Sequence, residues 1–245
     1  MAKAELNSKT LIVIPAFNEV ANIASVLNEI SISAPELDVL VVDDGSTDST
    51  FELASEHGVA VLRLPFNLGV GAAMRLGFKY ASQNGYESVV QVDADGQHVP
   101  KEIKSLLSKL DRFDVVIGSR FADGASGFEV TGSRRLAMRL LASSLSKITK
   151  VKLTDVTSGF RASGPRAIKL FATSYPPEYL GDTIESLVIA HRSGLLITEV
   201  PTTIRQRLTG TSSQSTVKAL IYTVRAAFVL FLSLLHRPAE SGTGK

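Results

Sequence analysis

Residues 88–98, Ser-Val-Val-Gln-Val-Asp-Ala-Asp-Gly-Gln-His, place two carboxylates one residue apart directly after an apolar run. That run is typical of a buried strand, and in extended backbone the side chains at i and i+2 point the same way, so we expect Asp93 and Asp95 to share one side. Two such carboxylates repel each other unless a cation lies between them, and an oxygen-only ligand set that includes Gln97 suits Mg2+ or Mn2+. An Asp-Gly turn that only caps the strand is the structural alternative.

Similar polar clusters follow two earlier apolar runs. Residues 11–14 run into Pro-Ala-Phe-Asn-Glu at 15–19, and residues 39–42 run into Asp-Asp-Gly-Ser-Thr-Asp at 43–48. Each cluster has a purely structural explanation, because proline ends a strand and one Asp or Asn suffices to cap a helix. The surplus acid in 43–48 favours a partner such as a ribose hydroxyl or a base N–H, since one carboxylate accepts two hydrogen bonds.

The elements that position these clusters alternate between strand and helix patterns. Uninterrupted apolar strands separated by helices indicate an α/β fold with a mostly parallel sheet covered on both faces. Ligands bind at the carboxyl ends of the strands in such sheets, where every polar cluster above is expected to lie. The expected strands are 11–14, 39–42, 59–62, 88–92, 114–118 and 195–200, with a polar strand-like segment at 155–161. The expected helices include one with Ile23, Val26, Leu27 and Ile30 on one face, then 69–81, a basic amphipathic helix at 133–150, and 181–192.

Residues 67–71, Asn-Leu-Gly-Val-Gly, superficially suggest a dinucleotide-binding loop. Met74 stands where the third glycine of that fingerprint belongs, and the loop does not follow the first strand. Glycines that allow a helix to approach the sheet, or backbone to approach a ligand, are the better explanation.

The composition sets limits on the class of protein. The chain has 245 residues, of which 44% are hydrophobic and 20% charged, as in an ordinary folded protein. A net charge of +2 gives no reason to expect a nucleic-acid partner, and the absence of cysteine excludes disulfides and thiolate metal sites. The first nine residues lack the apolar core of a signal peptide, and no apolar run is long enough to span a bilayer.

Five motifs in order resemble the family 2 glycosyltransferases, and within them the dolichol-/polyprenol-phosphate sugar synthase group. The motifs are Ile-Pro-Ala-Phe-Asn-Glu, Val-Val-Asp-Asp-Gly-Ser-Thr-Asp, Asn-Leu-Gly-Val-Gly, Asp-Ala-Asp-Gly-Gln-His and Gly-Ser-Arg, and the likeness spans residues 10–215. The resemblance implies a GT-A fold, a mostly parallel Rossmann-like sheet with flanking helices. It also implies inverting transfer of a sugar from a nucleotide-diphosphate donor with Mg2+ or Mn2+.

The resemblance also implies roles for particular residues. Asp93 is expected to be catalytic, near the donor sugar and the metal, with Asp95 and Gln97 as further metal ligands. The residues expected to line the nucleotide are Pro15, Ala16, Asn18, Glu19, Asp43, Asp44, Asn67 and Gly71. The residues expected to hold the acceptor phosphate or the diphosphate are Arg120, Arg134, Arg135, Arg161, Arg207 and Ser212, the last two in an Arg-x-x-Gly-x-Ser loop. Guanidinium groups match phosphate oxygens, although a solvated basic face remains the alternative.

Asp182 stands ahead of a helix pattern, where family 2 enzymes often carry a catalytic base. Helix capping is the structural alternative, and Glu185 is a second candidate base. A sugar hydroxyl acceptor needs such a base, whereas a lipid phosphate is already ionised and hardly does.

Residues 215–235 form the last expected element. Lys218, Tyr222 and Arg225 share one helical face, and the segment is apolar from Ala226 onward, which suits a helix lying in the headgroup region. Packing of this helix on the core or in a dimer is the alternative. The expected organisation is a GT-A domain at 1–214, an amphipathic, interfacial helix at 215–236 and a flexible tail at 237–245.

The sequence therefore predicts an inverting, metal-dependent glycosyltransferase that acts on a polyprenyl phosphate. It is expected to be cytoplasmic and peripheral at the inner face of the membrane, with a small membrane-protein partner or a homo-oligomer as options. The alternatives are a family 2 enzyme that glycosylates a hydroxyl of a glycan or glycolipid, and a non-catalytic nucleotide-sugar-binding subunit. A nucleotidyltransferase is disfavoured, because no glycine-rich triphosphate loop with a lysine follows the first strand.

Overall fold

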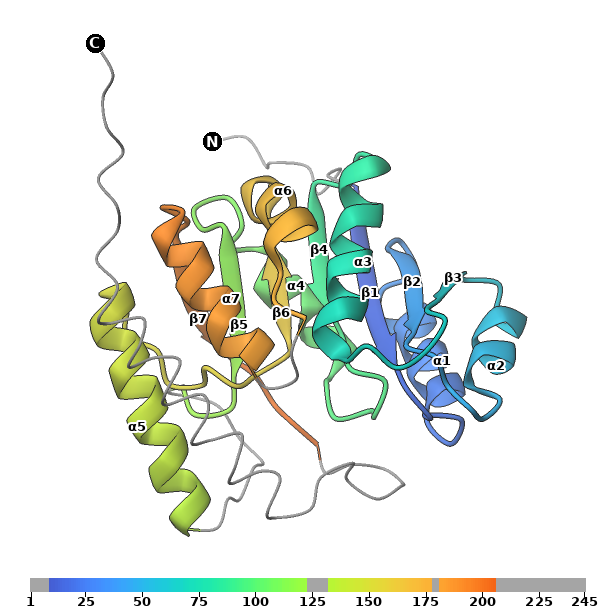
Figure 1. Ribbon diagram of the computed structural model, residues 1–245, viewed down its shortest axis with the longest axis horizontal. Coiled ribbons are helices and arrows are strands. Elements are labelled where there is room, and N and C mark those ends of the chain that lie inside the picture. Colours follow the sequence, from blue (N-terminus) through green and yellow to red (C-terminus); the bar gives the residue numbers. More distant parts are fainter. Residues whose placement is uncertain (1–8, 123–131, 178–180, 206–245) are drawn as a thin grey trace.

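The computed structural model of the protein describes residues 9–122, 132–177 and 181–205, which form a sheet with helices on both faces (Figure 1). Within these residues the strands are β1 (Thr10–Ala16), β2 (Asp38–Asp43), β3 (Ala60–Arg63), β4 (Ser88–Gln91), β5 (Val115–Ser119), β6 (Arg161–Ser163) and β7 (Ile197–Pro201). The helices are α1 (Ile23–Ser33), α2 (Thr50–Glu56), α3 (Val70–Gln83), α4 (Ile103–Leu107) after a 3-10 turn at Pro100–Glu102, α5 (Gly132–Thr149), α6 (Pro165–Ser174) and α7 (Gly181–Arg192).

The strands lie in the order β3-β2-β1-β4-β6-β5-β7. All neighbouring pairs are parallel except those of β6, which runs antiparallel to both β4 and β5. The prediction of a mostly parallel α/β sheet is thereby confirmed. Ala16 is paired with Asp43, and Asp43 with Arg63, so the carboxyl ends of β1, β2 and β3 meet at one edge of the sheet.

Alternating side chains of the central strands supply two apolar cores. Ile12 and Ile14 of β1 pack with the predicted face of α1, whose Ile23, Val26, Leu27 and Ile30 are all buried. Val13, on the opposite side of β1, packs with α3, where a Cβ added at Gly77 would lie only 2.5 Å from Val13 Cγ1. Close packing was predicted for the glycines of residues 67–71, whereas Gly77, which lies outside that stretch, is the residue at which α3 approaches β1 this closely.

Most predicted elements are present with small shifts of their ends, and one is wrong. Residues 155–160 form turns and irregular backbone instead of a strand, and only Arg161 begins β6. Short-range hydrogen bonds accompany these turns, because Thr157 Oγ1 donates to Asp155 Oδ1 at 3.2 Å and the Phe160 amide donates to Ser158 Oγ at 3.3 Å. Helices α4 and α6 were not predicted at all.

No helix in the described part of the chain combines the length and the apolar character needed to cross a membrane. The expected helix at 215–235 lies outside the described residues.

Candidate active site

The polar loops that follow β1 and β2 are joined by hydrogen bonds. The Asp44 amide donates to Ala16 O at 2.8 Å, and the Asn18 amide donates to Ser46 Oγ at 2.9 Å. In return, Asn18 Oδ1 accepts from the Thr47 amide at 2.9 Å. Asn18 adopts a left-handed backbone with φ of 54°, which asparagine tolerates better than most residues. The structure therefore brings these two sequence-predicted clusters together.

Glu19 lies in the same junction. Its amide donates to Thr50 Oγ1 at 2.9 Å, and its Oε2 accepts from Asn22 Nδ2 at 2.7 Å. Pro15 is half-buried and Ala16 is buried at the end of β1. These contacts fix the backbone at the carboxyl end of the strand, where a nucleotide is expected.

Asp44 connects a third loop to this edge. Its two carboxylate oxygens accept from the Leu68 and Gly69 amides, each at 2.8 Å. Burial raises the pKa of Asp44, and the two amide hydrogen bonds oppose that rise. Asp44 therefore holds the loop that carries the exposed Asn67, a positioning task that sequence reasoning did not anticipate.

Asp43 is fully buried and faces a residue that sequence reasoning missed. Arg63 Nε lies 3.1 Å from Asp43 Oδ2, and Arg63 Nη2 donates to Ser46 O at 2.9 Å. The contact with Arg63 is an ion pair without hydrogen-bond geometry, since no described residue donates a hydrogen bond to Asp43 Oδ2. The position of Arg63 at the end of an expected strand was the only signal for it in the sequence.

Gly71 approaches protein backbone. A Cβ at this position would lie 2.1 Å from Pro176 O, so the glycine allows α3 to pass against the segment that precedes α7. Its expected role in nucleotide binding stays a prediction, and its contact with Pro176 gives it a packing reason to be glycine.

Asp93 and Asp95 lie in a turn that follows β4. The strand ends at Gln91, and Ala94 and Asp95 lie in a turn, so the extended backbone from which a shared side was predicted is absent. The turn instead orders the side chains through short-range contacts. Asp95 Oδ1 accepts from the Gln97 amide at 3.0 Å, and Gln91 Nε2 donates to Asp93 Oδ1 at 3.0 Å.

The expected metal ligands fit a hard divalent ion by their chemistry. Gln97 Nε2 donates to Arg205 O at 3.3 Å, which assigns the other end of that amide, Oε1, as an acceptor oxygen for a ligand. Among the described residues, no group of three or more His, Asp or Glu side chains gathers as a metal cluster. Two carboxylates and one amide suit Mg2+ or Mn2+ all the same, because such ions keep several positions for water and phosphate oxygens.

Arg120, which was expected to bind a phosphate, is held by a polar network of protein groups. Its guanidinium pairs with both oxygens of Asp155, with Nη2 at 2.7 Å from Oδ1, and also donates to Thr157 Oγ1. Glu199 of β7 accepts from the Thr154 and Asp155 amides at 2.8–2.9 Å. The ion pair is almost buried, with 13% of the Arg120 side chain and none of the Asp155 side chain exposed.

Arg161 is buried, and its donors point at protein oxygens. It donates to the carbonyls of Val156, Ser158 and Thr183, at 2.8–2.9 Å, and to Ser186 Oγ. Burial lowers the pKa of Arg161. This geometry favours a role in joining the 156–158 loop to α7 over the expected contact with phosphate.

Asp182 lies in the first turn of α7 and is 1% exposed. Its Oδ2 is buried and accepts no hydrogen bond from a described residue. Burial raises the pKa of Asp182 to about 7, the nearby positive charge of Arg161 opposes this, and the negative charge of Asp93 adds to it. A carboxyl group of this kind is poised to exchange a proton near neutral pH.

Four expected site residues cannot be placed by their side chains. Arg134 and Arg135 belong to α5, but only the backbone of this turn is described. Arg207 and Ser212 lie outside the described residues. Their expected contacts with phosphate stay predictions.

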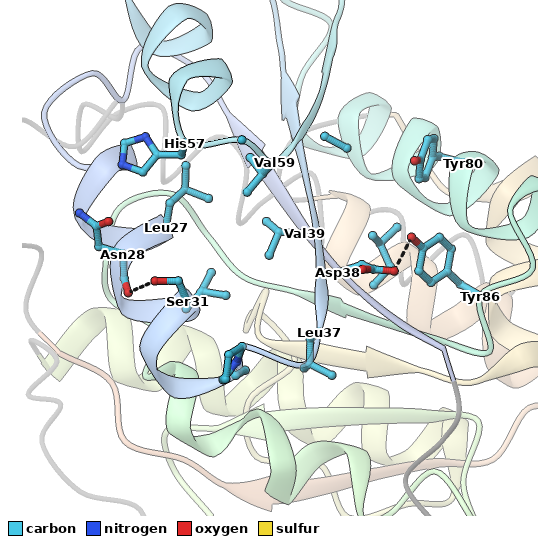
Figure 2. A pocket seen from close by; sticks show the side chains of 16 residues that line it. Leu27, Asn28, Ser31, Leu37, Asp38, Val39, His57, Val59, Tyr80 and Tyr86 are labelled. Carbon is cyan, nitrogen blue, oxygen red and sulfur yellow. Dashed lines mark hydrogen bonds between the residues drawn. The ribbon is translucent and has the colours of Figure 1, made fainter.

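A groove with a volume of ≈ 560 Å³ lies at the opposite end of the sheet (Figure 2). Its lining includes Asp38 at the beginning of β2, Val59 just before β3, and Tyr80 and Tyr86. Because the polar loops described above follow the carboxyl ends of the strands, this groove is separate from the candidate site.

Comparison with solved structures identifies the class of fold. The chain superposes on glucosyl-3-phosphoglycerate synthase from Mycobacterium tuberculosis, a structure that contains Mn2+, uridine diphosphate and glucosyl-3-phosphoglycerate, with a TM-score of 0.72. The superposition covers 98% of this chain and 84% of that one at 23% sequence identity. The protein therefore has the GT-A fold, as the motifs predicted.

Sequence comparison identifies the family. Residues 11–170 match the family model that is described as Glycosyl transferase family 2. The polyprenol monophosphomannose synthase of Mycolicibacterium smegmatis is 32% identical over 84% of this chain and 81% of that protein. The undecaprenyl-phosphate mannosyltransferase of Micrococcus luteus is 33% identical over 84% of this chain and 88% of that protein. The chain belongs to glycosyl transferase family 2, and it is a nucleotide-sugar-dependent glycosyltransferase.

Proposed function

We propose that the protein transfers a sugar, with inversion, from a nucleoside diphosphate sugar to a polyprenyl phosphate at the cytoplasmic face of the membrane. The observation that carries this proposal is the turn of Asp93, Asp95 and Gln97 at the end of β4, the strand next to β1. The oxygens proposed to bind the metal follow β4, which pairs with β1, and the loops after β1 and β2 are joined through Asn18 and Ser46, which supports a shared site. The two relatives named above support a polyprenyl phosphate as the acceptor.

The proposed chemistry needs a divalent ion at this turn. When bound, a Mg2+ or Mn2+ ion would supply positive charge to the diphosphate, which is the leaving group when an acceptor oxygen attacks the sugar. Asp95 and Gln97 are proposed to hold that ion, and Asp93 to face both the ion and the donor sugar. Arg120, fixed by Asp155, is proposed to provide positive charge for the acceptor phosphate.

A hydroxyl acceptor is the second candidate, and Asp182 is the observation that favours it. A sugar hydroxyl must lose a proton during attack, and a base with a pKa of about 7 is well matched to that task. A polyprenyl phosphate needs no such base. A non-catalytic nucleotide-sugar-binding subunit is disfavoured, because such a protein has no need for the two carboxylates of the metal turn.

A donor screen followed by a transfer assay tests the proposal. UDP and GDP sugars are compared by thermal shift with Mn2+, since a ligand at about 100 times its Kd adds roughly 2.7 kcal/mol to the stability. The stabilising donor is then offered to a short polyprenyl phosphate and to glycan hydroxyls. Transfer to phosphate is expected, and transfer to hydroxyls alone would replace the proposal with the second candidate.

Asp95→Ala tests the metal assignment. Asp111→Ala is the control, because it removes an exposed carboxylate that lies outside the turn of Asp93, Asp95 and Gln97. Asp95→Ala is expected to abolish Mn2+-dependent stabilisation by the donor and Mn2+-dependent transfer, and Asp111→Ala to retain both. Unchanged metal dependence in Asp95→Ala would contradict the assignment.

The membrane proposal rests on residues 215–235 and is tested separately. The full chain and a chain ending at residue 214 are mixed with anionic lipid vesicles and separated by flotation. We expect only the full chain to float. Flotation of both would show that this segment is not the membrane contact. In gel filtration, the elution volume of the full chain shows whether it forms a homo-oligomer.

A further inference from the structure

His98 contacts Asp93 at two points, although it belongs to none of the roles proposed so far. The Asp93 backbone amide donates to His98 Nδ1 at 3.0 Å. His98 Nε2 lies 3.6 Å from Asp93 Oδ2. One side chain, five residues farther along the turn, therefore contacts both the backbone and the carboxylate of the same aspartate.

The first contact determines where the imidazole carries its proton. Because Nδ1 accepts a hydrogen bond from an amide, the proton of the neutral ring is on Nε2. That N–H is then on the nitrogen nearest to the Asp93 carboxylate. The 3.6 Å separation is too long for a direct hydrogen bond, so the shorter contact to the backbone is the stronger of the two.

The imidazole itself is held rigidly. His98 is 5% exposed and stacks on the fully buried Phe160, with ring centroids 4.8 Å apart and planes at 22°. Its backbone forms an antiparallel bridge with Ile204, and the Arg205 amide donates to Gln97 O at 3.0 Å. Stacking on Phe160 and the backbone bridge to Ile204 restrict the movement of His98, so its contacts can in turn restrict the position of Asp93.

The remaining sides of the Asp93 carboxylate are also constrained. Gln91 Nε2 donates to Oδ1 at 3.0 Å. A Cβ added at Gly159 would lie 3.1 Å from both carboxylate oxygens, so the chain passes close to them there. The Asp93 side chain is nevertheless 37% exposed, which leaves an open side for a ligand.

We propose that His98 is a positioning residue that fixes the direction of the Asp93 carboxylate toward the metal and the donor. This inference rests on the proposed role of Asp93 at the metal turn. Groups that orient metal ligands from outside the ligand set commonly change metal affinity or activity by about 10–100-fold when they are replaced. A loosely held carboxylate would have to be ordered when the ion binds, and this cost would weaken the binding of the ion.

The test compares three variants that separate the two contacts. His98→Phe keeps a ring that can stack on Phe160 and removes both polar contacts. His98→Asn places an amide oxygen near the position of Nδ1, so it can accept from the Asp93 amide. His98→Gln places its amide nearer to the position of Nε2 and cannot replace the backbone contact.

Mn2+ affinity is measured by electron paramagnetic resonance of the free ion, with the full chain and the nucleoside diphosphate that stabilises it. His98→Phe is expected to bind Mn2+ about 10–100-fold more weakly, with His98→Asn recovering most of the loss and His98→Gln recovering little. Thermal unfolding without metal shows that each variant is folded. If His98→Phe does not fold, the inference is still tested by comparing the other two variants, because His98→Asn is expected to bind Mn2+ more tightly than His98→Gln.

Two results would overturn the inference. One is wild-type Mn2+ affinity in His98→Phe, and the other is a His98→Asn variant that binds no better than His98→Gln. Asp95→Ala is measured in parallel. If Asp95→Ala also binds Mn2+ normally, the metal turn itself is wrong, whereas loss in Asp95→Ala alone refutes only the role of His98.

Discussion

Replacing Asp182 with asparagine should make the protein more stable at pH 8 and leave its stability nearly unchanged at pH 4. Burial raises the pKa of this carboxyl group from 3.8 to about 7 in the folded protein. The folded state therefore keeps the proton to a higher pH than the unfolded state does. The stabilising contribution of the protonated group is complete below pH 3.8 and is lost as the pH rises through 7.

The size of the effect follows from the same change in pKa. A tenfold change in proton affinity is worth about 1.4 kcal/mol, so a rise from 3.8 to about 7 corresponds to about 4 kcal/mol between pH 4 and pH 8. The amide of asparagine has nearly the same shape and does not ionise. The attraction of the carboxylate to Arg161 is already contained in the pKa of about 7, so it does not reduce the expected growth of the difference with pH.

Urea unfolding at pH 4.5 and pH 8 gives the free energy of unfolding for the wild type and for Asp182→Asn. The difference between the two proteins should grow by roughly 2–4 kcal/mol toward pH 8. Asp111→Asn, at an exposed site, is the matched control and should show no such growth. An equal difference at both pH values would mean that Asp182 is not buried as a neutral acid, and the reasoning would be refuted.

The same variant distinguishes the two candidate acceptors. If Asp182 is a base, Asp182→Asn loses transfer and the wild-type rate rises with pH near 7. If the acceptor is an ionised phosphate, Asp182→Asn keeps most of its activity while its stability profile still changes. The stability and rate measurements on one variant therefore separate a structural from a catalytic carboxyl group.

Two further substitutions test the packing around the site. Gly71→Ala should destabilise the protein by about 1–3 kcal/mol in urea unfolding, because its Cβ would collide with Pro176 O, whereas Gly164→Ala, with its nearest neighbour 3.7 Å away, should be nearly neutral. Equal losses in the two would contradict the close approach. Asp155→Ala leaves the almost buried Arg120 without its partner and should cost about 3 kcal/mol by the same assay. A loss below roughly 1 kcal/mol would show that Arg120 finds solvent or another acceptor.

Much of the first half of the fold was predictable because its elements carry strong periodic signals. The buried face of α1 and the strands that lead to residues 15–19 and 43–48 were recognised from local patterns. Their convergence at one edge followed from the parallel sheet, and the hydrogen bond from the Asn18 amide to Ser46 Oγ confirms it. The sequence could not show which oxygens are used internally, as Asp44 shows by holding the Leu68 and Gly69 amides.

The second half was less predictable because its short elements depend on long-range pairing. Strand β6 has only three residues and forms through its pairing with β4 and β5, whereas the sequence indicated a strand-like segment at 155–161. Its polar residues indicated an extended chain, whereas they form a loop whose carbonyls are bound by Arg161. Propensity is overridden here by tertiary contacts.

Arg161 and His98 show opposite limits of inference from motifs. A motif position implied that Arg161 binds phosphate, yet the protein's own carbonyls surround it, and a guanidinium buried in this way stabilises the loop and α7 that it joins. His98 stood inside the most informative motif and received no role, because the motif names residue types and not the partner that each contacts. Both partners of His98 belong to Asp93, one through its backbone and one through its side chain. Under the proposed metal role of Asp93, the direction of its carboxylate would depend on the His98 ring as well as on the ligands that face the ion.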